Sequence, residues 1–285
     1  MTRSTTIPPF DAFEIAGWKG RSEAYLEHID PLTEHAVETL LALLGVGVGD
    51  SLLDVGCGPG TLAARAAARG AAVTGCDIAE DMVELARRLH PELTVDVADA
   101  AALPYLDGAF DAAVLASLVQ HTARAEEMVA EAVRVVRPGG RVVVSAYATP
   151  DKARFVGVFG AASARVPLTP PADVPPGPHM FVYADHAALD GLLASAGLAD
   201  RRVTEFAFTH RVASAAALLE ALGRGTVRAA ALLDAQTPET LAALEAAIAE
   251  ELEPYRSPDG GHEVPVAFTL ATGIRPFDPL IQESP

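Results

Sequence analysis

Three glycines and an aspartate in one short stretch have the residue types and spacing of a ligand-binding turn. Gly56, Gly58 and Gly60 lie in LLDVGCGPG, residues 52–60, directly after an apolar run that contains Asp54. A strand that ends in a glycine turn and opens a helix brings bare backbone close to a ligand, and the helix N-terminus adds free N–H donors. We therefore expect this turn to hold a ligand.

Two further acids follow at the ends of the next two predicted strands. Asp77 lies 21 positions after Gly56, a spacing at which an acidic side chain can accept hydrogen bonds from both hydroxyls of a ribose. Asp99, in VADAAALP, is placed to accept a hydrogen bond from the exocyclic amine of an adenine. One such aspartate is readily explained as a helix cap or turn residue. Three acids on three consecutive strands are harder to explain in that way.

A nicotinamide dinucleotide is one alternative ligand for the glycine turn. The fingerprint G-x-G-x-x-G, counted from Gly56, requires glycine where the sequence has Thr61. Pro59 also removes one N–H group from the loop, which weakens the case for a pyrophosphate. The turn fits a ligand with a carboxylate, an amino group and a sugar at least as well.

The elements that position these residues alternate between short apolar runs and helical patterns. Between the runs, apolar residues recur at spacings of three and four, as in residues 79–90. This alternation predicts an α/β fold with parallel strands and a ligand crevice at their carboxyl ends. The predicted strands are residues 51–57, 71–78, 93–100, 110–117 and 141–147, and the predicted helices are residues 61–70, 79–90 and 124–138.

The chain divides into four predicted segments. We expect an N-terminal helical cap over residues 1–45, a core over 46–150, a lid insertion over 151–186, and the remainder of the core sheet over 187–285. The lid contains VPLTPPADVPPGPHM, whose prolines exclude a regular helix. The last segment contains a helix ending near Gly197, strands over 201–213 and 264–273, and a helical region over 213–254 with Thr237 as N-cap. That helical region is interpreted as a solvated surface, a lid or a homodimer surface.

Composition and charge exclude several classes of partner. The 285 residues carry a formal net charge of −17, and no Lys/Arg cluster with interleaved aromatics occurs, so we expect no nucleic-acid or anionic-membrane partner. No apolar run approaches the length of a membrane span, and we expect a cytoplasmic protein. Two cysteines, Cys57 and Cys76, are too few for a disulfide framework, and we expect no structural metal.

The sequence over residues 46–147 resembles the class I S-adenosylmethionine-dependent methyltransferases, in particular the small-molecule type-11 group that includes quinone-biosynthesis C-methyltransferases. The resemblance rests on LLDVGCGPG, VTGCDIAEDMVELAR, ADAAALPYLDGAFDAAVLASLVQHT and EAVRVVRPGGRVVVSAY. It implies a Rossmann-like, seven-stranded, mostly parallel sheet whose last strand is antiparallel. It also implies S-adenosyl-L-methionine as cofactor and S-adenosyl-L-homocysteine as product.

The same resemblance implies roles for individual residues. Asp54 and Gly56 to Gly58 would lie near the methionine moiety, Asp77 would bind the ribose, and Ile78 and Met82 would flank the adenine. Asp99 and the Ala100 amide would form hydrogen bonds with the edge of the adenine. An aromatic residue of the N-terminal cap would close over the cofactor. Tyr25 is the candidate for that closing residue, with Trp18 and His28 nearby. The full set of implied cofactor residues is Tyr25, Asp54, Gly56, Cys57, Gly58, Asp77, Ile78, Met82, Asp99, Ala100 and Ala116.

Methyl transfer is an in-line displacement that depends chiefly on alignment and exclusion of water. For a hydroxyl or carbon acceptor a general base helps, and His121, just past the fourth predicted strand, is the candidate. His179 in the lid is a second histidine candidate. The segment after that strand lacks the Asn/Asp-Pro-Pro-aromatic motif of nucleobase amino-methyltransferases. Apolar residues of the lid region predict a small hydrophobic acceptor: Phe155, Val156, Val158, Phe159, Met180 and Phe181.

Two other functions stay open from the sequence. One is a protein of this fold that binds S-adenosylmethionine structurally or for a reaction without methyl transfer, because the same cofactor motifs would serve it. The other, less favoured, is an NAD-dependent oxidoreductase.

Overall fold

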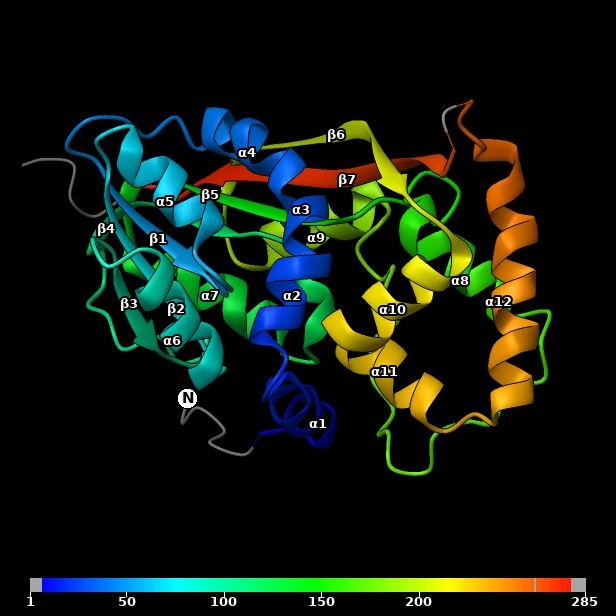
Figure 1. Ribbon diagram of the computed structural model, residues 1–285. Coiled ribbons are helices and arrows are strands. Elements are labelled where there is room, and N and C mark those ends of the chain that lie inside the picture. Colours follow the sequence, from blue (N-terminus) through cyan, green and yellow to red (C-terminus); the bar gives the residue numbers. More distant parts are fainter. Residues whose placement is uncertain (1–6, 259, 278–285) are drawn as a thin grey trace, which may run out of the picture.

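A seven-stranded sheet forms the centre of the computed structural model, which describes residues 7–258 and 260–277 (Figure 1). The strand order is β3-β2-β1-β4-β5-β7-β6. Strand β7 is antiparallel to both of its neighbours, and the other strands are parallel to one another. The strands are β1 (Ser51–Val55), β2 (Ala72–Asp77), β3 (Thr94–Val97), β4 (Phe110–Leu115), β5 (Val136–Tyr147), β6 (Ala199–Val212) and β7 (His262–Ile274). The fold class predicted from the sequence is confirmed.

Helices cover the sheet and extend past it. The first group precedes or connects the parallel strands: α1 (Pro9–Trp18), α2 (Ser22–His28), α3 (Asp30–Thr33), α4 (Val37–Leu44), α5 (Thr61–Ala68), α6 (Glu80–Leu89) and α7 (Ala125–Val135). The second group follows β5: α8 (Arg154–Ser163), α9 (His186–Ser195), α10 (Ala215–Gly225), α11 (Val227–Asp234) and α12 (Pro238–Leu252). Single 3-10 turns are η1 (Glu34–Ala36), η2 (Val119–His121) and η3 (Glu253–Tyr255).

Strands β6 and β7 continue beyond the rest of the sheet. The last pair between β5 and β7 is Tyr147 with Phe268, whereas β6 and β7 remain paired as far as Val212 with His262. Helix α8 packs against β7 and α10 against β6, while α12 packs on α8 and α10 and α11 packs on α10 (Figure 1). The elements after β5 therefore form a wall beside the carboxyl ends of the parallel strands, where the predicted crevice lies.

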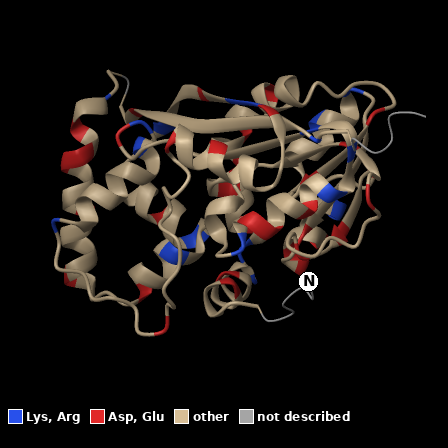
Figure 2. Cartoon of the chain, turned by 180° about the vertical axis from the view of Figure 1, so that it is seen from behind, with Lys and Arg blue, Asp and Glu red and all other residues tan. Residues whose placement is uncertain are grey.

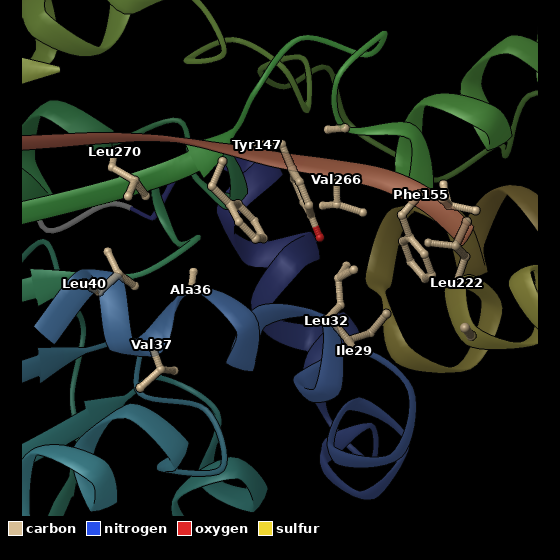
Figure 3. Packing of buried hydrophobic residues seen from close by; sticks show 14 of the residues in the cluster. Ile29, Leu32, Ala36, Val37, Leu40, Tyr147, Phe155, Leu222, Val266 and Leu270 are labelled. Carbon is tan, nitrogen blue, oxygen red and sulfur yellow. The ribbon is translucent and has the colours of Figure 1, made fainter. Parts of the chain in front are cut away.

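The core beneath that wall is aliphatic and aromatic. Figure 3 shows Tyr147 of β5 pointing toward Ile29 and Leu32 of the N-terminal helices, with Phe155 and Leu222 of the later helices nearby. Ile29 and Leu32 are buried, as is Phe155. Burial of such side chains stabilises by roughly 1.5–3 kcal/mol each, so this cluster ties the N-terminal helices to the elements after β5.

One local prediction needs correction. The helix expected to continue to Pro138 ends at Val135, and β5 begins at Val136 and contains Pro138. The register with β4 shifts between the pairs Phe110 with Val136 and Ala112 with Arg141, so the intervening residues lie in an irregularity where proline needs no ladder hydrogen bond.

Residues 213–254 are helical, as predicted, and divide into the three helices α10, α11 and α12. The first break lies at Thr226, whose extended backbone (φ −134°, ψ 157°) ends α10 and starts α11. The second precedes α12, where Thr237 caps the helix as predicted by accepting a hydrogen bond from the Thr240 N–H.

Basic and acidic residues are interspersed over the chain, as Figure 2 shows from behind. Within the described residues, none of the helices combines the length and the apolar character that crossing a bilayer requires. The longest of them, α12, has 15 residues. The expected segment boundaries and the expected homodimer surface stay predictions.

Candidate active site

The glycine turn after β1 has a backbone that only glycine adopts easily. Gly56 and Gly58 both have positive φ, at 70° and 53°. A Cβ atom on Gly56 would lie 2.8 Å from the Leu118 side chain, and one on Gly58 would lie 3.7 Å from the Tyr25 ring. Side chains at these two positions would therefore strain the turn and narrow the space in front of it.

Asp77 joins the end of β2 to this turn. Its Oδ2 accepts a hydrogen bond from the Gly58 N–H at 3.0 Å, and its Oδ1 accepts one from the Ala79 N–H at 3.0 Å. Burial raises the pKa of Asp77, and these backbone donors act in the opposite direction. Each carboxylate oxygen keeps a second lone pair, so the side chain can still accept hydrogen bonds from a ligand.

Asp54 is a buried carboxyl with an unused oxygen. It is 1% exposed, and its Oδ2 has no hydrogen-bond partner. Burial, followed by the nearby charge of Asp77, raises the pKa of Asp54 to about 7. No group donates a hydrogen bond to this Oδ2 atom. A cationic N–H group on a ligand would supply that hydrogen bond and would also favour the ionised form of Asp54.

A cavity of about 320 Å³, called the main cavity below, opens in front of the glycine turn and Asp77. Part of its wall contains residues with predicted cofactor roles, namely Tyr25, Gly56, Gly58, Asp77, Ile78, Met82 and Ala116. The rest of its wall is mostly apolar and comes largely from β5, α8, the lid, α10 and α11. It includes Tyr147, Val156, Phe159, Met180, Phe181, Leu222, Ala229 and Leu232. One space therefore touches both the predicted cofactor residues and the apolar elements after β5.

Two smaller cavities adjoin the same turn. The first, about 60 Å³, lies against α1 and is lined by Ala100, Arg124 and Met128, among others. The second, about 50 Å³, is lined by Asp54 and Cys57 together with N-terminal residues. With the main cavity, they account for all but one of the predicted cofactor residues.

Asp99 is the predicted cofactor residue that lines none of these three cavities. Its carboxylate accepts hydrogen bonds from Nη1 and Nη2 of Arg124, at 2.9 and 3.2 Å, and from the Ala101 N–H at 2.9 Å. In this structure Asp99 orients Arg124 and the turn after β3. Its contact with an adenine stays a prediction.

Two aromatic residues of the N-terminal helices lie at the main cavity. Tyr25 and Trp18 both line it, and their rings meet edge to face with centroids 5.8 Å apart. His28, the third residue considered in this region, lines none of the three cavities. Helices α1 and α2 thus bring two aromatic side chains to the same cavity, and their closure over a cofactor stays a prediction.

His121 occupies the boundary between the main cavity and the small cavity beside α1. It ends the 3-10 turn η2 after β4 and lines both spaces. Its Nδ1 lies 3.3 Å from Oε2 of Glu14, and the Trp18 ring packs edge to face against the imidazole at 5.6 Å. His179 also lines the main cavity, but its Nδ1 accepts a hydrogen bond from the Phe181 N–H at 3.2 Å. Of the two histidines that line the main cavity, His121 is therefore the one that contacts a carboxylate.

Sequence reasoning missed the buried charges around His121. Glu14 of α1 is 3% exposed and accepts a hydrogen bond from Nε of Arg228 at 2.7 Å. Arg228 of α11 also donates to the carbonyl oxygens of Pro178 and Gln120. Burial alone would raise the pKa of Glu14, but the hydrogen bonds and charges of His121 and Arg228 outweigh it and lower that pKa.

Asp11 and Arg124 form a second buried pair beside the first. Asp11 is 3% exposed and accepts hydrogen bonds from the Thr122 hydroxyl, the Ala123 N–H and Nε of Arg124. The available sequence signal was the spacing of Asp11, Glu14 and Trp18, which places all three on one face of a helix.

Comparison with known proteins agrees with this geometry. A family profile described as "Methyltransferase domain" matches residues 53–144. Residues 53–144 are therefore similar in sequence to a methyltransferase domain. The resemblance seen in the sequence is thereby confirmed for the part of the chain from within β1 to within β5.

Two curated relatives match the same region. The chain is 38% identical over 120 residues to a demethylmenaquinone methyltransferase of Beutenbergia cavernae, covering 42% of this chain and 50% of that protein. It is 37% identical over 127 residues to the methyltransferase GfsG of Streptomyces halstedii, covering 41% of this chain and 46% of that protein. The chain therefore aligns with about half the length of these relatives.

Solved structures share the fold over most of the chain. The YcgJ protein of Bacillus subtilis has a TM-score of 0.57 at 15% identity, covering 86% of this chain and 99% of that one. The [4+2]-cyclase SpnF has a TM-score of 0.51 at 21% identity, covering 86% of this chain and 82% of that one. At such identities the likeness concerns the fold alone.

Proposed function

We propose that this methyltransferase-domain protein transfers a methyl group from S-adenosylmethionine to an oxygen or carbon atom of a small, neutral, hydrophobic acceptor. The observation that carries the proposal is the main cavity. It is lined both by the glycine turn with Asp77 and by the apolar residues of the elements after β5. An enzyme that joins two substrates needs one space that both can reach.

The residues at the turn fit the cofactor. The unpartnered Oδ2 of Asp54 is suited to the ammonium group of the methionine moiety, and the missing side chains at Gly56 and Gly58 leave room for close approach. Asp77 retains acceptor capacity for ribose hydroxyls. When bound, S-adenosylmethionine supplies an electrophilic methyl group, and its transfer leaves S-adenosylhomocysteine.

The charge of the main cavity favours a neutral acceptor. Arg228 is the one Lys or Arg among the residues that line it, and its guanidinium is paired with the buried Glu14 and with two carbonyl oxygens. A phosphorylated or carboxylated acceptor would meet no uncompensated cation in this lining. Aromatic and aliphatic residues such as Phe159 and Phe181 instead favour an apolar body.

His121 is proposed as the general base for a hydroxyl or acidic C–H acceptor. As the acceptor atom bonds to the methyl carbon, its proton moves to the imidazole, which becomes an imidazolium paired with Glu14. The electron pair of the broken carbon–sulfur bond stays on sulfur, so charge and atoms balance. His121 lines the main cavity and contacts the Glu14 carboxylate, which supports this role.

A second candidate is a protein that binds the cofactor without transferring its methyl group. The fold of this chain is similar to that of the [4+2]-cyclase SpnF, which is named for a reaction other than methyl transfer. A similar fold can therefore serve another reaction, which supports the second candidate. The same pocket residues would bind the cofactor in either case. Product formation separates the two candidates.

The first experiment is calorimetric titration of cofactor-free protein with S-adenosylmethionine, S-adenosylhomocysteine and NADH. Binding of the two sulfur ligands without NADH supports the proposal, and binding of NADH alone contradicts it. The second experiment incubates the protein and S-adenosylmethionine with hydroquinones, including reduced demethylmenaquinone, and with phenols, polyketides and terpenoid alcohols. Acceptor-dependent S-adenosylhomocysteine, measured by mass spectrometry, establishes methyl transfer. Tight cofactor binding with no product from any acceptor favours the second candidate.

A further inference from the structure

Helix α1 presents a row of polar and aromatic side chains to the segment that carries His121. Asp11, Glu14 and Trp18 are three and four residues apart, and the structure places all three against residues 121–124. This helix lies outside the matched methyltransferase domain, residues 53–144. The surroundings of His121 are therefore built in part by a helix that the family profile does not cover.

The surface against which α1 packs is close-fitting and makes polar contacts with the helix. A Cβ atom on Gly17 would lie 2.2 Å from the Val227 side chain at the start of α11. The Asp11 carboxylate accepts hydrogen bonds from Thr122, Ala123 and Arg124 at 2.6 to 2.9 Å. Buried charge-assisted hydrogen bonds of this kind fix geometry strongly, because an unpaired carboxylate would be costly there. Helix α1 thus has a defined position relative to His121.

Glu14 is fixed from two sides. Oε1 accepts a hydrogen bond from Nε of Arg228 at 2.7 Å, and Oε2 lies 3.3 Å from Nδ1 of His121. The lowered pKa of Glu14 keeps it ionised near neutral pH. An ionised carboxylate can only accept a hydrogen bond, so the Nδ1 that faces it must carry the proton. A neutral imidazole with a proton on Nδ1 has its basic lone pair on Nε2.

We propose that Glu14 is a positioning residue that holds His121 in the Nδ1-protonated form and leaves Nε2 as the proton acceptor. The inference rests on the proposed function, since it concerns the base of that reaction. Because Glu14 belongs to α1, the pair exists only when α1 is seated over the cavity wall. Trp18, four residues further on, limits rotation of the imidazole by packing against its edge. After proton transfer, the Glu14 carboxylate stabilises the imidazolium.

The test is nitrogen NMR of protein with ¹⁵N-labelled histidine, saturated with S-adenosylhomocysteine at pH 8.5. The His121 signals are identified by their loss in His121→Gln. We expect a protonated Nδ1 and an unprotonated Nε2 in the unaltered protein. Protonation of His121 Nε2 at this pH, in a neutral ring or an imidazolium, overturns the proposal.

The test variant is Glu14→Ala, and the control variant is Glu245→Gln, at an exposed and remote position of α12. Glu14→Ala should lose the Nδ1-protonated signature, and Glu245→Gln should keep it. A Glu14→Ala protein that is folded and binds S-adenosylhomocysteine but keeps the signature overturns the role of Glu14. If Glu14→Ala fails to fold, the spectrum of the unaltered protein still decides. Titration of the unaltered protein with S-adenosylhomocysteine separately tests the proposed function. Failure of this ligand to bind contradicts the proposed function, whereas the protonation state of His121 is decided by the spectrum.

Discussion

Replacing Asp54 with Asn is expected to stabilise the ligand-free protein at pH 8 and to weaken cofactor binding. Burial and the charge of Asp77 raise the pKa of Asp54 from its usual 3.8 to about 7. One pKa unit corresponds to about 1.4 kcal/mol, so the ionised carboxyl destabilises the folded state by up to about 4 kcal/mol relative to the unfolded chain. Asn has a similar shape and no charge, so the variant avoids this cost.

The sign follows from the higher pKa in the folded state. The stabilising contribution of protonated Asp54 is fully present below about pH 4 and is lost as the pH rises through about 7. Between pH 5 and pH 8, ionisation of Asp54 lowers the free energy of unfolding of the unaltered protein by roughly 3 kcal/mol. The Asp54→Asn variant has no such ionisation and loses none of this stability. At about 2–4 °C per kcal/mol for a chain of this size, the Tm advantage of the variant should grow by roughly 5–10 °C between the two pH values.

The assay is scanning calorimetry of both proteins at pH 5 and pH 8 without ligand, with the exposed Asp173→Asn as control. A Tm difference between Asp54→Asn and the unaltered protein that is equal at the two pH values refutes the raised pKa. In titrations at pH 8, Asp54→Asn should bind S-adenosylhomocysteine about 10- to 150-fold more weakly, because a charge-assisted hydrogen bond contributes roughly 1.5–3 kcal/mol. Equal affinity would exclude Asp54 from the methionine site.

Three further outcomes are expected. Asp77→Ala should weaken S-adenosylhomocysteine binding about 5- to 150-fold, from roughly 1–3 kcal/mol of lost hydrogen bonding, and unchanged affinity in calorimetry would remove Asp77 from the ribose site. His121→Ala should lower kcat by roughly a hundredfold with cofactor affinity retained, and an unaltered rate would leave transfer to alignment alone. Phe181→Ala should raise the acceptor KM about tenfold without affecting S-adenosylhomocysteine affinity, because it removes apolar contact area from the wall of the main cavity. An equal loss of cofactor affinity would place Phe181 at the cofactor instead.

The parts that sequence predicted well are those encoded by contiguous residues. The run over residues 51–55 is a strand and the glycines after it form the turn, because alternation of apolar runs and helices is a local pattern. The ends of β1 and β2 then meet at one edge of a parallel sheet, which brings Asp54 and Asp77 together. The local pattern was misleading at Pro138, which was expected to end a helix but lies in β5. The register shift between β4 and β5 leaves this proline where no ladder hydrogen bond is needed.

The surroundings of His121 could not be predicted in this way. Glu14 lies 107 positions before His121 and 214 positions before Arg228, and no local pattern indicates such pairs. Their contact depends on where α1 and α11 pack, which is determined by close approaches such as Gly17 to Val227. Acidic residues on an N-terminal amphipathic helix would ordinarily be interpreted as solvent-exposed. Only the structure shows that two of them, Asp11 and Glu14, are buried.

The same division explains why the acceptor does not follow from the relatives. The matched residues, 53–144, provide the glycine turn, Asp77 and the strand ends, so proteins that share them can share cofactor geometry. The apolar wall begins at Tyr147 and continues through α8, the lid, α10 and α11. The partner of His121 comes from α1, before the matched region. Under the proposed function, acceptor choice and the orientation of His121 therefore depend on segments outside residues 53–144, and variation in those segments would change the acceptor while the cofactor turn stays the same.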